Sequence, residues 1–231
     1  MAPRVGLFQT LVCRAPRPQH ARMDPIRESY DRVARAYAER LAGELAHKPW
    51  DRAVLDGFAA RNAGRGLVGD IGCGPGHVGA YIAARGAEVV GIDLSAGQIA
   101  EARRLHPGLA FEEGDMLRLG DRPRRFAALV AFYALVHLPP GALGAALRQF
   151  HAALRPGGEV LLALHLGGEA LRVQALWDQP VDLTFHLFAE EDVVGAAAAS
   201  GLREVWREAR DPYPDVEYPS RRLYLRAVRP A

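Results

Sequence analysis

The segment LVGDIGCGPGHVGAYIAARGAEVVGIDLS, residues 67–95, constrains the fold of this chain more than any other. An apolar run leads into a glycine-rich loop, a helical stretch follows, and a second apolar run ends on Asp93. Nicotinamide dinucleotides, flavins and S-adenosylmethionine are all bound by a strand, a glycine loop, a helix and an acid in this order. The segment therefore predicts a strand-helix-strand unit that binds an adenosine-bearing ligand, and it leaves the reaction open.

Short apolar runs continue to alternate with helical patterns beyond this segment, as is typical of a parallel sheet covered on both faces. Residues 142–158, ALGAALRQFHAALRPGG, are expected to be one of these helices. Near the end of the chain, 202–209 and 221–230 alternate as strands with a short connection, which predicts an antiparallel hairpin. We expect a doubly wound, Rossmann-like α/β fold preceded by N-terminal helices.

A single domain is expected, because 231 residues with 49% hydrophobic side chains can bury one core without metal or disulfide. It covers residues 24–231 and begins with a helical cap over 24–62, where apolar residues recur at helical spacing. Residues 166–188 fit no repeat of the sheet and are a candidate substrate-site insertion. Residues 1–23 show no periodic apolar face, so we expect a disordered tail that folding does not require.

Composition excludes several partners. A net charge of +2 is too small for a surface selected by nucleic acid or anionic lipid, and no apolar run reaches membrane-spanning length. Cys13 and Cys73 are a poor disulfide pair and have no metal-ligand spacing, which favours a reducing cytoplasm and no metal. A small-molecule substrate is the expected partner, and a homodimer is left open.

The residues around the glycine loop discriminate between the possible ligands. Residues 74–79 match G-x-G-x-x-G, but Gly72 and Asp70 precede the match and give D-x-G-x-G-x-G. A carboxylate at the strand tip suits an ammonium group and would repel a pyrophosphate. The loop therefore favours a ligand with an amino-acid moiety, while a dinucleotide-dependent oxidoreductase stays as the weaker alternative.

Five segments resemble the motifs of the class I S-adenosylmethionine-dependent methyltransferases: VGDIGCGPG, VGIDLS, EEGDM, FAALVAFYALVHLP and LRPGGEVLLALH, in this order. The leading Y-D-x-x-A-x-x-Y, from Tyr30 to Tyr37, is similar to the small-molecule branch of the type 11 and type 25 kind. The resemblance implies a seven-stranded sheet of order 3-2-1-4-5-7-6 with strand 7 antiparallel. It also implies S-adenosylmethionine as cofactor and metal-independent methyl transfer to oxygen or nitrogen of a small molecule. A non-catalytic module that binds the cofactor is the alternative.

Residue roles follow from the same resemblance. Asp70 and the loop glycines would hold the methionine portion, Asp93 the ribose hydroxyls, and Asp115 the adenine amino group. Where the family often has methionine, this chain has Gln98, which leaves the packing of the adenine open. The implied cofactor-binding residues are Tyr30, Tyr37, Asp70, Gly72, Cys73, Gly74, Gly76, Asp93, Leu94, Gln98, Asp115, Met116, Ala131 and Phe132.

The chemistry is expected just after the fourth strand. His137 is the first candidate for a general base, because imidazole titrates near working pH, and a role in shaping the loop is equally consistent. Tyr133 is the second catalytic candidate, as a hydrogen-bond partner of the acceptor or as an aromatic wall. His165 and His186 are candidate substrate residues, each equally consistent with a structural histidine.

Overall fold

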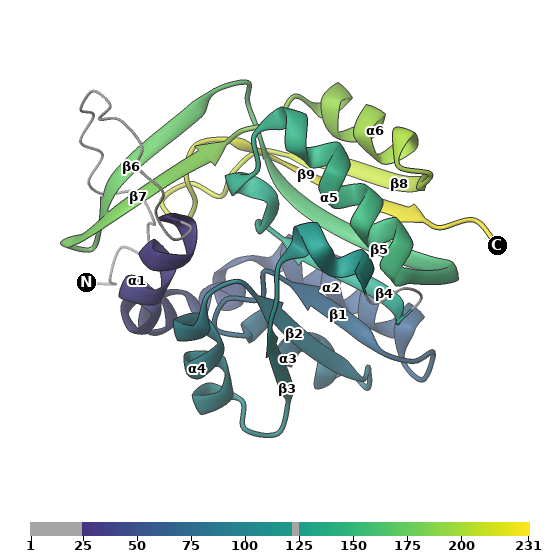
Figure 1. Ribbon diagram of the computed structural model, residues 1–231, viewed down its shortest axis with the longest axis horizontal. Helices are drawn as coiled ribbons and strands as arrows, with labels where there is room; N and C mark the ends of the chain where they lie inside the picture. Colours follow the sequence, from purple (N-terminus) through teal and green to yellow (C-terminus); the bar gives the residue numbers. More distant parts are fainter. Residues whose placement is uncertain (1–24, 122–124) are drawn as a thin grey trace.

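A seven-stranded sheet forms the centre of the protein (Figure 1). The computed structural model describes residues 25–121 and 125–231, so the predicted tail lies outside the described residues. The strands of this sheet are β1 (Val68–Ile71), β2 (Val89–Asp93), β3 (Ala110–Glu113), β4 (Phe126–Phe132), β5 (Leu154–Leu166), β8 (Arg203–Arg210) and β9 (Arg221–Val228). Their order is β3-β2-β1-β4-β5-β9-β8. Neighbours from β1 to β5 are parallel, whereas β9 is antiparallel to both β5 and β8.

This arrangement confirms the expected order 3-2-1-4-5-7-6, because β8 and β9 are the sixth and seventh strands of the sheet. β1 lies at the centre and pairs with β2 and β4, and all four of its residues are buried. The carboxyl ends of β1, β2 and β4 meet at one edge, where ligands bind in doubly wound folds. The order thus places the glycine loop and the end of the fourth strand side by side.

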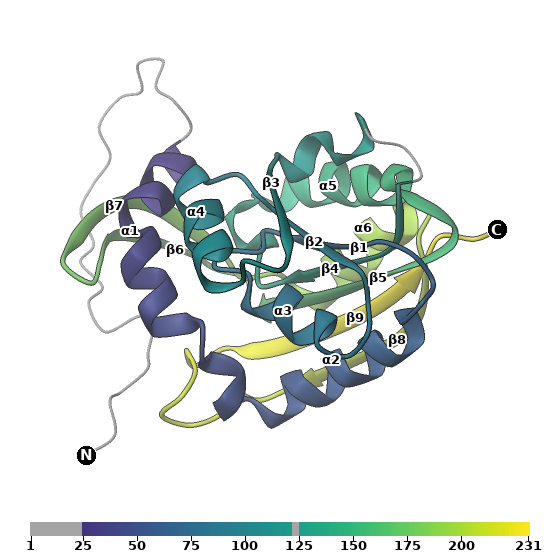
Figure 2. The same cartoon turned by 90° about the horizontal axis from the view of Figure 1, so that it is seen from below.

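Helices cover both faces of the sheet, as the continuous apolar strands predict. Figure 2 shows α5 on one side of the strands and α2 and α3 on the other. The helices are α2 (Pro49–Asn62), α3 (His77–Ala83), α4 (Ala96–Leu105), α5 (Pro140–Ala153) and α6 (Glu190–Ala199). Phe126, Phe150 and Phe188 lie in the core beneath α5 and α6, while Phe58 and Ile82 lie in the core on the opposite face.

The first helix and the insertion form a separate apolar layer. α1 (Pro25–Leu41) packs on the antiparallel hairpin of β6 (Ala170–Leu176) and β7 (Gln179–His186), beyond the edge of the main sheet (Figure 1). Val33 is fully buried in a cluster with Leu183 of the hairpin, and the backbone N–H of Asp182 donates to the hydroxyl of Ser29. The segment 166–188 is therefore mostly a β-hairpin held by α1.

The helix expected over 142–158 is too long. α5 ends at Ala153, and Leu154 already pairs with Phe126 as the first residue of β5. Pro156 and Gly157, whose φ is +74°, cannot continue a helix, so the chain extends there instead. Three short 3₁₀-helices complete the fold: η1 (Glu44–His47), η2 (Met116–Asp121) and η3 (Leu135–His137).

Candidate functional site

Two cavities meet at the carboxyl ends of β1, β2 and β4. Cavity A contains about 990 Å³ of empty space and cavity B about 910 Å³, each with its open mouth included. The residues that line both cavities are Tyr37, Gly72, Gly74, Phe132 and Tyr133. The glycine loop and the end of β4 therefore form the boundary between the two spaces.

The glycine loop needs its glycines for conformation and for space. Gly72, Gly74 and Gly76 have φ values of +66°, +52° and +81°, which residues with a Cβ adopt at a cost. A Cβ on Gly72 would lie 2.4 Å from the Cβ of Ala134, and one on Gly76 would clash with Phe111. The loop can thus pass close to η3 and expose its backbone to both cavities.

Asp93, at the end of β2, is fixed between the loop and α4. One carboxylate oxygen accepts from the N–H of Gly74 at 2.9 Å, and the other accepts from the N–H of Ser95 at 2.9 Å. Burial raises the pKa of this carboxyl. Because a carboxylate oxygen accepts more than one hydrogen bond, Asp93 retains acceptor capacity toward cavity A, which it lines.

The rest of cavity A suits an adenosine moiety. Leu94 and Met116 provide apolar surface on its wall, and Asp115 lines the same cavity and accepts from the N–H of Leu117 at 2.8 Å. The amide of Gln98 is buried, and neither of its polar atoms has a partner within the described part of the chain. Apolar walls, two carboxylates with acceptor capacity and an unpaired amide are a composition that fits a purine and a ribose diol.

Asp70 is buried at the end of β1 without an ion pair among the described residues. Its Oδ2 atom accepts from the N–H of Gly79 at 2.8 Å, and the residue lines cavity B. Burial raises the pKa of this carboxyl to about 7. An ammonium group at this position would restore the ionised form, because an opposite charge favours the carboxylate.

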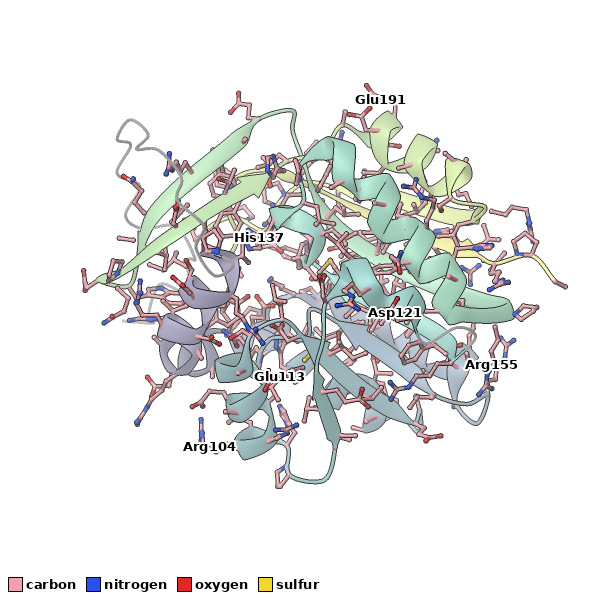
Figure 3. All side chains as sticks on the ribbon, viewed as in Figure 1. Arg104, Glu113, Asp121, His137, Arg155 and Glu191 are labelled. Atoms are coloured by element: carbon pink, nitrogen blue, oxygen red, sulfur yellow. The ribbon has the colours of Figure 1, made fainter. Side chains whose placement is uncertain are left out.

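His137 is held at both ring nitrogens. Its Nδ1 atom lies 2.8 Å from the carbonyl oxygen of Thr184 in β7, and its Nε2 atom lies 2.7 Å from the hydroxyl of Tyr30. A carbonyl only accepts, so Nδ1 carries the hydrogen and Nε2 accepts from Tyr30 in the neutral ring. Figure 3 shows His137 on the inner side of the hairpin, near α1. The residue lines cavity A as expected, but it has no unoccupied nitrogen.

Tyr133 follows β4 with φ of +54° and turns its hydroxyl away from the boundary of the cavities. The hydroxyl lies 3.2 Å from Asp51 and 3.0 Å from the hydroxyl of Tyr224, and both partners are fully buried. Burial raises the pKa of Tyr133 well above its ordinary value. The hydroxyl is therefore engaged by Asp51 and Tyr224, while the residue lines both cavities, and its role toward an acceptor stays a prediction.

The structure places most of the predicted site residues on the cavities, but not all. Gly76 caps the start of α3, Ala131 is fully buried within β4, and His186 ends β7; none of the three lines either cavity. The predicted residues that do line a cavity are Tyr30, Tyr37, Asp70, Gly72, Cys73, Gly74, Asp93, Leu94, Gln98, Asp115, Met116, Phe132, Tyr133, His137 and His165.

Sequence reasoning missed four charged residues of cavity B. Glu44 and Lys48 lie at η1 and α2, and Glu217 and Arg222 lie before and within β9. No motif surrounds them, and they converge only when the ends of the chain fold together. Within residues 25–121 and 125–231, no group of three or more His, Cys, Asp or Glu could hold a metal ion. No described helix is both long and apolar enough to cross a membrane.

Comparisons with known proteins agree with this geometry. A family model described as a methyltransferase domain matches residues 68–158. The demethylmenaquinone methyltransferase of Beutenbergia cavernae is 35% identical over 136 residues, which are 58% of this chain and 55% of that protein. The malonyl-[acyl-carrier protein] O-methyltransferase of Pseudescherichia vulneris is 30% identical over 179 residues, 75% of this chain and 69% of that protein. The chain thus spans little more than half of the first relative and just over two thirds of the second.

A solved structure shows the same fold over nearly the whole chain. The 1,6-didemethyltoxoflavin-N1-methyltransferase of Burkholderia thailandensis, with bound 1,6-didemethyltoxoflavin and S-adenosylhomocysteine, superposes with a TM-score of 0.66 at 23% identity. The superposition covers 93% of this chain and 94% of that chain. The likeness therefore includes the sheet, the helical cap and most of the C-terminal half.

Proposed function

The chain belongs to the class I S-adenosylmethionine-dependent methyltransferases, and we propose that it methylates an oxygen or nitrogen atom of a small-molecule acceptor without a metal ion. The observation that carries the proposal is the junction of cavities A and B at the glycine loop. One cavity has the composition for adenosine, and the other extends past Asp70 into a second space with polar walls. Two ligands can therefore meet at the loop.

The residues of cavity A would hold the adenosine portion of the cofactor. Asp93 accepts from the two ribose hydroxyls, since its two oxygens are fixed by backbone N–H groups. Asp115 accepts from the adenine amino group, with Leu94 and Met116 on the faces of the ring. Gln98 supplies a further polar contact on the same wall. The bound cofactor supplies an electrophilic methyl group on a sulfonium sulfur.

The loop and the N-terminal tyrosines would hold the methionine portion. Asp70 pairs with the ammonium group, which accounts for a carboxyl buried without an ion pair among the described residues. Tyr30 and Tyr37 contact each other edge to face at 5.6 Å between ring centroids, and both line cavity A. His137 holds the hydroxyl of Tyr30, so we assign it a positioning role rather than the role of general base.

Positioning and exclusion of water would supply most of the acceleration. Displacement at a sulfonium methyl needs an in-line approach and little covalent help from the protein. α1 lines cavity A and packs on the β6–β7 hairpin through a shared apolar cluster, which supports exclusion of water on that side. From the composition, we also infer that the protein works in the cytoplasm and does not act on nucleic acid. Whether it forms a homodimer is left open.

The first test is methyl transfer from labelled S-adenosylmethionine to a panel of small molecules, together with calorimetry of cofactor binding. We expect S-adenosylmethionine and S-adenosylhomocysteine to bind and NAD not to bind. Binding without transfer to any acceptor would favour the alternative of a non-catalytic binding module. Binding of NAD in place of S-adenosylhomocysteine would favour an oxidoreductase, which the buried carboxyl of Asp70 argues against.

A further inference from the structure

One wall of cavity B contains residues to which the proposed function assigns no contact with the cofactor. Lys48 precedes α2, His165 is the penultimate residue of β5, and Arg222 is the second residue of β9, yet all three line the same cavity. The rings of Tyr133 and His165 lie 5.0 Å apart between centroids, and that of Tyr218 lies 6.5 Å from His165. The wall therefore combines flat aromatic surface with three nitrogen-bearing side chains.

His165 lines this cavity, and Ser220 and Arg222 hold its ring in place. Its Nδ1 atom lies 2.8 Å from the hydroxyl oxygen of Ser220, and that oxygen already accepts from Nη1 of Arg222 at 3.2 Å. When the Ser220 hydroxyl donates to Nδ1, the ring hydrogen resides on Nε2. Burial, followed by the charges of Arg222 and Lys48, lowers the pKa of His165 to about 3. The ring is thus neutral at physiological pH and carries one N–H donor.

Arg222 is a buried cation with donors to spare. It is 2% exposed, and its Nη1 atom donates to the carbonyl oxygens of Tyr218 and Ser220. Its Nε atom lies 3.5 Å from Glu217, and its Nη2 atom makes no hydrogen bond within the described part of the chain. The uncommitted Nη2 group of this cation suits an anionic oxygen partner.

Apart from Asp70, which the proposed function assigns to the ammonium group of the cofactor, the carboxylates of cavity B are already engaged. Glu217 accepts two hydrogen bonds from Arg210, at 2.7 and 3.0 Å, and one from the N–H of Tyr213. Glu44 accepts from Lys48 at 2.7 Å and pairs with His77 at 3.0 Å. Burial raises the pKa of Glu44, but Lys48 and His77 outweigh it and lower the value to about 2. The groups left for a ligand are therefore mainly N–H donors.

Three histidines at the site are poorly placed to act as a base. The pKa of His165 is about 3, the Nδ1 atom of His77 is buried, and both nitrogens of His137 are engaged. His47 also lines cavity B. An acceptor that arrives as an anion needs no base from any of these residues.

We propose that cavity B binds the carboxylate group of a small organic acid and that the product is its methyl ester. This inference rests on the proposed function and specifies its acceptor. One carboxylate oxygen forms a bond to the methyl carbon while the bond from that carbon to sulfur breaks. The electron pair of the broken bond stays on sulfur, which becomes the neutral thioether of S-adenosylhomocysteine, and no proton moves. Arg222 and His165 orient the carboxylate.

The test is the alkali lability of the methylated product. The full chain is incubated with S-adenosylmethionine carrying a labelled methyl group and with benzoate, phenylacetate, succinate, phenol and benzylamine in separate reactions. Methyl esters release labelled methanol in mild alkali, while methyl ethers and methylamines do not. We expect label to appear as volatile methanol with one or more of the acids. Transfer that is confined to alkali-stable products would overturn the carboxylate acceptor and leave the proposed function standing.

Binding gives a second measurement that does not require turnover. On the protein saturated with S-adenosylhomocysteine, we expect calorimetry to show at least one of these acids binding ten-fold or more tightly than its amide. Arg222→Gln and His165→Phe should each reduce this preference at least five-fold. The matched control is Arg226→Gln in the same strand, which lines neither cavity and should keep it.

The two variants are first compared with the parent by thermal melting, because Arg222 is buried. If Arg222→Gln does not fold, the His165→Phe variant and the acid-to-amide comparison on the parent decide the result. Equal affinity of every acid and its amide would overturn the inference. Failure of the parent to bind S-adenosylhomocysteine would contradict both the proposed function and this inference.

Discussion

The hydroxyl oxygen of Tyr30 lies 2.7 Å from Nε2 of His137, and this contact joins α1 to η3 across cavity A. The two residues are 107 positions apart in the chain. The imidazole is fixed on its other side by the carbonyl oxygen of Thr184 in the hairpin. One ring therefore connects the hairpin to two segments that line the cavity, α1 and η3.

The first prediction concerns this pair. His137→Ala and Tyr30→Phe should weaken S-adenosylhomocysteine binding and turnover to a similar extent, and the double variant should lose little more. Residues in direct contact are expected to couple by about 0.5 to 3 kcal/mol in a double-mutant cycle, which calorimetry and initial rates measure. If His137 were the general base instead, His137→Ala alone would lower turnover by roughly 10² to 10⁴ and remove the acidic limb of the rate profile.

The second prediction concerns the ribose contact. Asp93→Ala should lose about 2 to 4 kcal/mol of S-adenosylhomocysteine affinity, because two charge-assisted hydrogen bonds disappear. Calorimetry measures the change, and Asp121→Ala is the matched control, since that acid is exposed and pairs with Arg118 outside both cavities. Unchanged affinity in Asp93→Ala would contradict the ribose assignment.

The third prediction concerns the pH dependence of Asp70. Its folded-state pKa of about 7 lies above the ordinary value of 3.8, so the folded protein binds more protons than the unfolded chain between these values. The free energy of unfolding therefore falls as pH rises through this window, by up to about 1.4 kcal/mol per pH unit. The substitution Asp70→Asn removes this contribution, because an amide does not titrate. Its side-chain oxygen can still accept from the N–H of Gly79.

Urea unfolding of the ligand-free protein is the measurement for Asp70→Asn. We expect the variant to be more stable than the parent at pH 8 and close to it at pH 4. The same variant should bind S-adenosylmethionine more weakly at pH 8, since the charge opposite the ammonium group is lost. A variant that is less stable than the parent at pH 8 would show that the carboxylate is stabilised by something other than the proposed ligand.

The fourth prediction separates structure from catalysis at Tyr133. Tyr133→Phe removes a buried hydroxyl that pairs with Asp51, so the free energy of unfolding should fall by about 1 to 2 kcal/mol. Turnover should stay within about threefold of the parent, because the aromatic wall is retained. Tyr81→Phe is the control, as its hydroxyl pairs with a surface acid and should matter little for stability. A large loss of turnover in Tyr133→Phe at unchanged stability would restore the hydroxyl as a catalytic group.

The sheet and the glycine loop at its edge are predictable from the sequence alone, because both depend on local patterns. Apolar runs of strand length, helical periodicity and the glycine spacing from Gly72 to Gly76 are visible in consecutive residues. Asp93 ends a strand and Asp115 follows one, so the parallel sheet brings both to the same edge. The hairpin within 166–188 does not follow from the sequence pattern, because its strands pair outside the main sheet.

The hydrogen bonds of the candidate residues depend on tertiary contacts. The position of His137 after the fourth strand favours a catalytic role, yet its nitrogens are occupied by Tyr30 and Thr184, which lie far from it in the chain. Lys48 and Arg222 carry no motif, and they face one cavity because η1, α2 and the start of β9 pack together. Donor and acceptor groups find partners across the fold rather than along the chain, so the chemistry of cavity B emerges only after folding.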